Sequence, residues 1–294
     1  MGRPSSVVLE RGPKRALDPF RAYGAFVEDE ADGSGATVPV ATILLTNREC
    51  PWRCVFCDLW QNTLDETVPA GAIERQIRAA LAELPPARWI KLYNAGSFFD
   101  PRAIPPSDHP GIAAALAGFE RVIVECHPAL VGESALRLRD LLRGRLEVAM
   151  GLEIANASVL ARLEKGMTLE DFARAAEFLR RGTIDLRAFI LVQPPFVAAA
   201  DAVAESSRSL AFAEECGASV CSLIPTRPGP RLGTLEAAFD DGLSRARSRV
   251  FADLWELERF SECARCFPAR RDRLERQNRT QRREPRVACD ACRG

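Results

Sequence analysis

Short apolar runs alternate with amphipathic segments along most of the chain. Apolar runs that predict strands lie at residues 40–45, 89–93, 121–125, 146–152, 186–192 and 219–224. Segments with helical spacing of apolar residues lie at 69–84, 111–117, 136–142, 156–163, 168–181, 201–216 and 243–260. Strands that alternate with helices in this way predict a parallel sheet.

Six such strands favour an α/β fold in which the sheet closes partway into a (β/α)6 TIM-like barrel, because a full eight-unit barrel would need more residues. A doubly wound sheet is the alternative, and it would also bind ligands at the carboxyl ends of its strands. We expect an N-terminal lead-in over residues 1–37, with an acidic turn at 28–32, and a core barrel over 38–260. A small cysteine-containing module should follow over 261–294.

Composition narrows the class of protein without naming a partner. Lys plus Arg and Asp plus Glu both number 40, so net charge indicates no ligand, and 47% hydrophobic residues exclude wholesale disorder. No window approaches the roughly 18 apolar residues of a membrane span, and the start lacks a secretory signal, so we expect a cytoplasmic protein without membrane contact. Seven of the ten cysteines fall in tight groups, which is typical of metal ligands in a reducing compartment.

The first cysteine group lies in TNRECPWRCVFCDLW, directly after the first predicted strand. Cys50, Cys54 and Cys57 have the spacing CxxxCxxC, and aromatic Phe56 precedes the third thiol. A structural zinc site needs four protein ligands, whereas three thiolates on a [4Fe–4S] cluster leave one iron open. The count therefore favours a catalytic iron–sulfur cluster over a zinc knuckle or three buried thiols.

This cysteine loop resembles the signature of the radical S-adenosylmethionine (radical SAM) superfamily in both its spacing and its aromatic residue. The stretches IKLYNAGSFFDPRAIP, VIVECHP, LEVAMGLE, KGMTLEDFARAAEFL and RAFILVQPPF resemble the radical SAM subunit of archaeosine synthase, in the group that includes the elongator catalytic subunit and the tRNA methylthiotransferases. The resemblance implies the partial barrel, a [4Fe–4S] cluster on the three cysteines, and Phe56 against the cofactor.

The same resemblance implies a reaction. The open iron would bind S-adenosylmethionine, and an electron donor such as flavodoxin or ferredoxin would drive its cleavage to a 5′-deoxyadenosyl radical, which takes hydrogen from the substrate. The implied substrate is a 7-deazaguanine nucleotide in tRNA, so that the function would be tRNA modification. A radical enzyme acting on a small metabolite or peptide is one alternative, and a non-catalytic metal-stabilised RNA-binding protein is another. The oligomeric state stays open.

Polar and small residues end the middle strands. Asn94, Gly96 and Ser97 form a segment where backbone can approach a ligand closely, and the resemblance implies contact with the amino group of S-adenosylmethionine. Glu125 and Glu153 end two apolar strands, and a carboxylate is costly to bury there unless it meets donors such as ribose hydroxyls or an ammonium group. Pairing with Arg or Lys at the barrel mouth is the alternative.

Further candidates follow the later strands. Lys165 lies where it could hold a cofactor carboxylate, Val192 could pack on adenine, and Gln193 could hydrogen-bond cofactor or substrate. Arg227, after the sixth predicted strand, could bind a phosphate or carboxylate at the barrel mouth. A solvated loop arginine is an equal alternative. We interpret His127 as an ordinary hydrogen-bonded core residue.

The C-terminal module contains two CxxC pairs, formed by Cys263, Cys266, Cys289 and Cys292. Two such pairs fit a tetrahedral structural zinc site, while a second iron–sulfur cluster and four unbound thiols are the alternatives. Residues 265–294 also carry ten arginines against four acids, which favours RNA-backbone binding over a merely solvated helix face.

Overall fold

One curved sheet forms the centre of the computed structural model, which describes residues 11–227 and 229–292. Its eight strands lie side by side in chain order: β1 (Gly24–Ala31), β2 (Thr37–Leu44), β3 (Trp89–Tyr93), β4 (Arg121–Cys126), β5 (Arg145–Glu153), β6 (Asp185–Val192), β7 (Val220–Pro225) and β8 (Arg249–Ala252). Strand β1 is antiparallel to β2, and each later neighbouring pair is parallel. The expected parallel α/β barrel is therefore confirmed, and the sequential strand order excludes the doubly wound alternative.

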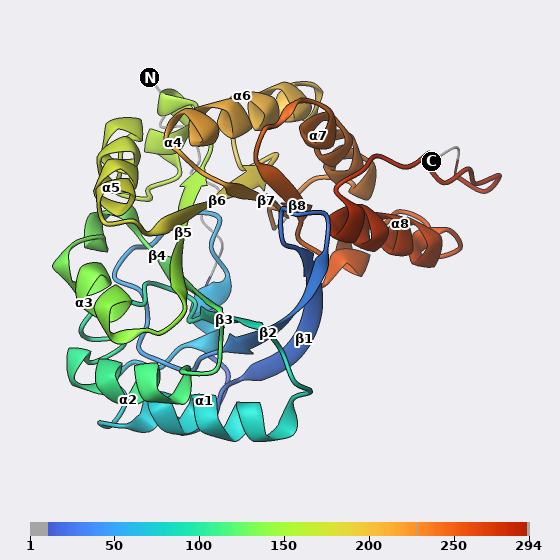
Figure 1. The fold of residues 1–294 in the computed structure, drawn as a ribbon. Coiled ribbons are helices and arrows are strands. Elements are labelled where there is room, and N and C mark those ends of the chain that lie inside the picture. Colours follow the sequence, from blue (N-terminus) through green and yellow to red (C-terminus); the bar gives the residue numbers. More distant parts are fainter. Residues whose placement is uncertain (1–10, 228, 293–294) are drawn as a thin grey trace.

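The helices surround the sheet on its outer side (Figure 1). They are α1 (Ala72–Glu83), α2 (His109–Ala115), α3 (Glu133–Leu141), α4 (Ala157–Arg162), α5 (Leu169–Arg181), α6 (Ala202–Glu215), α7 (Leu232–Arg245) and α8 (Phe267–Thr280). Outward-facing strand residues such as Ile43, Ile90 and Leu92 are fully buried against these helices. None of the helices in the described part of the chain has the length and apolar composition needed to cross a membrane.

Two strands were not expected. Strand β1 lies inside the predicted lead-in and acidic turn, and β8 lies inside the predicted helix over 243–260, so both predictions were wrong at these places. Helix α7 instead ends at Arg245, and β8 has only four residues. The acidic sequence of β1 concealed it, because its alternate residues Glu28 and Glu30 face charged partners inside the barrel rather than an apolar core.

The barrel interior holds a buried ion-pair network. Lys91 pairs with Glu28 and Glu30 of β1, and its ammonium lies 2.8 Å from the Glu28 carboxylate. Arg187 of β6, whose side chain is 1% exposed, reaches Glu30 at 2.8 Å and Glu147 at 2.7 Å. Because these charges are paired on all sides, removing one partner would leave an uncompensated buried charge. The network fastens β1 to the far side of the barrel.

No strand ladder joins β1 to β8 in the described residues, so the barrel has a seam between them. The Arg249 guanidinium spans this seam at one end and donates to the carbonyl of Ala31 at 2.6 Å. The carboxyl ends of β2 to β8 meet at the opposite end, which we call the mouth. In barrels of this kind, ligands bind at that end.

Candidate functional site at the barrel mouth

The cysteine loop extends from the end of β2 to the short 3-10 helix η1 (Leu59–Asn62). Its two ends are held together, since the Glu49 N–H donates to the Leu64 carbonyl at 2.8 Å and the Leu64 N–H donates to the Asn47 carbonyl at 2.8 Å. Within the loop, the Cys57 N–H donates to the Cys54 carbonyl at 3.1 Å. The two ends of the loop therefore lie side by side, and the residues between them lie at the mouth.

All three thiols of the loop are partly buried. Burial raises the pKa of Cys54 to about 12 and that of Cys57 to about 11, and it also raises the pKa of Cys50. Thiolates in such a place need a nearby positive charge, which a bound metal centre supplies. The sulfur atoms of these three cysteines do not form one of the close groups, found among the described residues, that could hold a single metal ion. A cluster that offers a separate iron to each thiolate fits the donor set better than one ion.

Trp52, between the first two cysteines, fastens the loop to the barrel. Its indole stacks on the His127 ring, with centroids 3.6 Å apart and planes 8° apart. His127 is fixed in turn, because its Nδ1 accepts from the Ala129 N–H at 3.1 Å and its Nε2 lies 3.0 Å from the Lys165 carbonyl. Burial lowers the pKa of His127 to about 4, so the ring is neutral. The sequence did not predict this pairing, although an aromatic Trp52 inside the cysteine loop was an available signal for it.

The segment after β3 wraps around Glu125. The Glu125 carboxylate accepts from the backbone N–H of Asn94 and, at 3.4 Å, from that of Gly96. A Cβ at Gly96 would lie 3.4 Å from the Cys50 Cβ, so this segment also touches the cysteine loop. Burial raises the pKa of Glu125 to about 7. The Ser97 hydroxyl is engaged elsewhere, since it accepts from the His127 N–H at 3.2 Å.

Asn94 has unmet hydrogen-bonding capacity. Its side chain is fully buried, yet neither the side-chain nitrogen Nδ2 nor the side-chain oxygen Oδ1 has a hydrogen-bond partner in the described structure. The Oγ1 of Thr46 and the Oδ1 of Asn47, at the start of the cysteine loop, are also buried without a partner. A buried polar group left unpaired costs about 1–3 kcal/mol. Such groups at a strand end fit a polar ligand that would pair with them.

Glu153 and Lys165 form a buried ion pair 2.5 Å long. Gly151 leaves room for it, because a Cβ there would lie 2.2 Å from the Glu153 carboxylate and 2.5 Å from the Lys165 ammonium. Burial lowers the pKa of Lys165, but Glu153 and Cys54 outweigh that effect and leave the pKa raised. The structure thus places Lys165 near Cys54 of the cysteine loop and pairs it with Glu153.

Strained backbone gathers at the same strand ends. Ala95, Glu153 and Gln193 have φ values of 51°, 67° and 52°, and they lie at the ends of β3, β5 and β6. Non-glycine residues with such values are uncommon and concentrate at functional sites. Val192 is fully buried beside Gln193, and Phe56 packs partly buried against the core.

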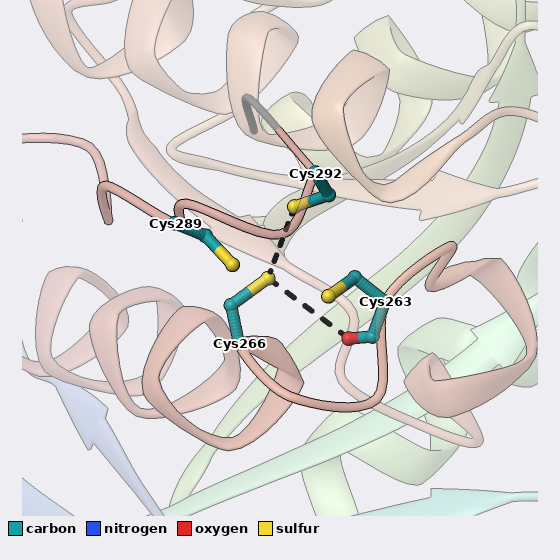
Figure 2. Close-up of side chains that lie close together, drawn as sticks. All are labelled: Cys263, Cys266, Cys289 and Cys292. Carbon is teal, nitrogen blue, oxygen red and sulfur yellow. Dashed lines mark hydrogen bonds between the residues drawn. The ribbon is translucent and has the colours of Figure 1, made fainter.

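The C-terminal cysteines form a second site. The sulfur atoms of Cys263, Cys266, Cys289 and Cys292 all lie within 4.8 Å of one another, and their side chains point toward a common centre (Figure 2). The Cys266 and Cys292 sulfurs are 3.6 Å apart, close to the ~3.8 Å between thiolates around a tetrahedral zinc. This group could hold a metal ion, and the expected four-cysteine site is confirmed.

Several arginines of the C-terminal module stabilise the fold. Arg270 pairs with Glu236 of α7 at 2.6 Å, and Arg273 pairs with Asp240 at 2.6 Å, with all four side chains buried. These side chains dock α8 on α7 and cannot reach a phosphate backbone. A second set stays exposed without an ion pair in the described chain: Arg265, Arg271, Arg282 and Arg283, of which Arg283 donates to the Ser244 hydroxyl at 3.2 Å.

An open α/β barrel with a three-cysteine loop at its mouth is what the resemblance to the radical SAM superfamily implied, and the four-cysteine site near the C-terminus is what the two CxxC pairs predicted. No protein-family model matches the sequence. The chain is 24% identical over 229 residues to an archaeosine synthase subunit beta of Methanosarcina acetivorans, covering 72% of this chain and 64% of the relative. A protein of the same name from Thermococcus kodakarensis is 30% identical over 131 residues, or 42% of this chain and 40% of the relative. The expected resemblance is confirmed.

An uncharacterized protein of Methanocaldococcus jannaschii, MJ0550, is 26% identical over 227 residues, covering 72% of this chain and 62% of that protein. The chain thus spans less than two thirds of the length of each of these relatives. Among solved structures, the radical S-adenosylmethionine methyltransferase TsrM of Kitasatospora setae matches 63% of this chain and 35% of its own, with 18% identity and a TM-score of 0.47.

Proposed function

We propose that the protein is a radical SAM enzyme that modifies tRNA. The observation that carries the proposal is the junction of the three-cysteine loop with unpaired buried polar groups and strained strand ends at the barrel mouth. A [4Fe–4S] cluster held by the three cysteines would supply the electron for reductive cleavage of S-adenosylmethionine.

In this proposal, Cys50, Cys54 and Cys57 hold the cluster. Lys165 supplies positive charge beside these thiolates, and the Glu153 carboxylate holds its ammonium group in place.

The fully buried side-chain amide of Asn94 offers its NH2 group as donor and its oxygen as acceptor to the cofactor, two residues before Gly96. Gln193 adds a hydrogen-bonding side chain at the end of β6, whereas Val192 is fully buried in the core and offers no surface to adenine.

Anaerobic reconstitution with iron and sulfide tests the cluster and the reaction. The reduced protein should convert S-adenosylmethionine to methionine and 5′-deoxyadenosine, and Cys54→Ala should lose both the cluster absorbance and the product. Cys216→Ala is the matched control, because Cys216 lies at the end of α6 away from the loop. Failure of the fully loaded protein to form 5′-deoxyadenosine would refute the enzymatic function.

The tRNA substrate rests on the names of the two archaeosine synthase relatives and on the exposed arginines near the four-cysteine site. Arg271→Gln combined with Arg282→Gln should weaken tRNA binding and lower its salt dependence by up to about one counterion per lost phosphate contact. Arg143→Gln, an exposed arginine between α3 and β5, is the control and should change neither. An unchanged salt dependence in the double variant would refute phosphate binding by the module.

A further inference from the structure

Three large apolar side chains are exposed in the described part of the chain: Leu59 at 41%, Leu141 at 44% and Trp255 at 45%. Leu59 lies at the end of the cysteine loop, and Trp255 lies just after β8, so both are on the mouth side of the barrel. Leu141 lies at the end of α3. Single exposed apolar residues are ordinary on a protein surface, so a binding role for Trp255 needs evidence beyond its exposure.

That evidence begins with the salt bridge beside it. The Arg227 guanidinium lies 3.1 Å from the Asp58 carboxylate and 3.2 Å from the Glu256 carboxylate. Asp58 directly follows the last cysteine of the loop, and Glu256 directly follows Trp255. One arginine therefore holds the Trp255 segment against the loop on which the proposed cluster lies.

The second observation is the ring on which Trp255 rests. Its indole stacks on Phe26, with centroids 5.8 Å and planes 23° apart. Side chains alternate along a strand, so Phe26 shares a face of β1 with Glu28, which pairs with Lys91 inside the barrel. Residue pairing places this end of β1 beside the end of β2, at the mouth. The stacked pair thus covers the seam between β1 and β8 where it opens at the mouth.

The third observation is the rigid backbone of the segment. The Asp253 carboxylate accepts from the Trp255 N–H at 3.0 Å, and Glu256 has a left-handed φ of 49°. Leu257, the next residue, is buried and anchors the segment in the core. An exposed aromatic ring that is already fixed loses little conformational entropy when a ligand stacks on it. Asp253 also retains acceptor capacity for N–H donors.

We propose that Trp255, supported by Phe26, is a stacking platform for a planar base of the RNA substrate, and that Asp253 accepts an N–H from the edge of that base. This inference rests on the proposed function and assigns it a substrate-binding surface. A flat indole at the mouth suits a heteroaromatic ring, because every base offers a π-face and most offer N–H donors along an edge.

The test compares variants of the reconstituted full chain for binding to unfractionated tRNA under anaerobic conditions. Trp255→Ala should weaken binding about 5- to 150-fold, the range that corresponds to the loss of one base–aromatic stack. Trp255→Tyr retains a stacking ring and should stay within about fivefold of the parent chain. Leu141→Ala removes an equally exposed apolar side chain remote from the mouth and should leave the affinity unchanged.

Two further readouts separate stacking from a structural role. Addition of tRNA should quench indole fluorescence in the parent chain, and Trp255→Tyr should lose much of that quenching while still binding. Equal affinity in Trp255→Ala and the parent chain would overturn the platform, as would equal losses in the Ala and Tyr variants. If the parent chain binds no tRNA, the platform and the tRNA substrate fail together, whereas 5′-deoxyadenosine formation tests the radical SAM chemistry independently.

Discussion

Substitution of Gly166 by alanine should displace the cysteine loop from the barrel. Gly166 follows Lys165 and has a φ of 72°, in the left-handed region. An added Cβ would lie 2.9 Å from Cδ1 and Nε1 of the Trp52 indole, so the ring would have to move. Because Trp52 stacks on His127, that movement would disrupt the contact that fastens the loop.

The magnitude follows from two separate effects. A left-handed conformation costs a non-glycine residue about 1–2 kcal/mol. Loss of a stacked ring pair costs about 0.5–1.5 kcal/mol more. Gly166→Ala should therefore lower the free energy of unfolding by about 1.5–3.5 kcal/mol. Gly217→Ala is the control, because Gly217 has a φ of 92° but no atom within 4 Å of an added Cβ, and so carries only the backbone effect.

Equilibrium urea unfolding of the reconstituted protein measures both losses, and near-ultraviolet circular dichroism reports the packing of the tryptophans. We expect Gly166→Ala to exceed Gly217→Ala by about 0.5–1.5 kcal/mol, to change the tryptophan signal, and to retain less iron per chain. Equal losses in the two variants, together with an unchanged tryptophan spectrum, would refute the fastening role of Trp52.

Three more predictions concern the ion pair, the neutral histidine and the C-terminal site. Glu153→Gln leaves the buried Lys165 ammonium unpaired and should lower the free energy of unfolding by about 3–5 kcal/mol in urea, and a loss under about 1 kcal/mol would contradict the pairing. The unfolded His127 takes up a proton near pH 6.5 but the folded one only near 4, so stability should fall as pH drops through that window, and His127→Gln should flatten the dependence. Cys289→Ser should release the metal of the C-terminal site, measured by elemental analysis, which also distinguishes zinc from iron; full retention would exclude a four-thiolate site.

Much of the molecule was predictable because its signals are local. The spacing of Cys50, Cys54 and Cys57, the apolar runs of β2 to β7 and the two CxxC pairs each depend on residues close together in the chain. Parallel strands carry their ends to one side of the sheet, so the location of the candidate residues at the mouth followed from the strand–helix alternation alone.

Other features depend on partners distant in sequence. Strand β1 is stable in the barrel because Arg187, 157 residues from Glu30, neutralises its inward carboxylate. Arg270 and Arg273, which the sequence suggested for phosphate, are buried because α7 presents Glu236 and Asp240 to them.

The stacking of Trp52 on His127 likewise required the end of β4 to meet a loop that leaves β2. The sequence by itself determined which chemistry the chain can carry. The tertiary structure decided which charges remain available for a ligand, because a charge that folding pairs and buries is no longer free to bind one.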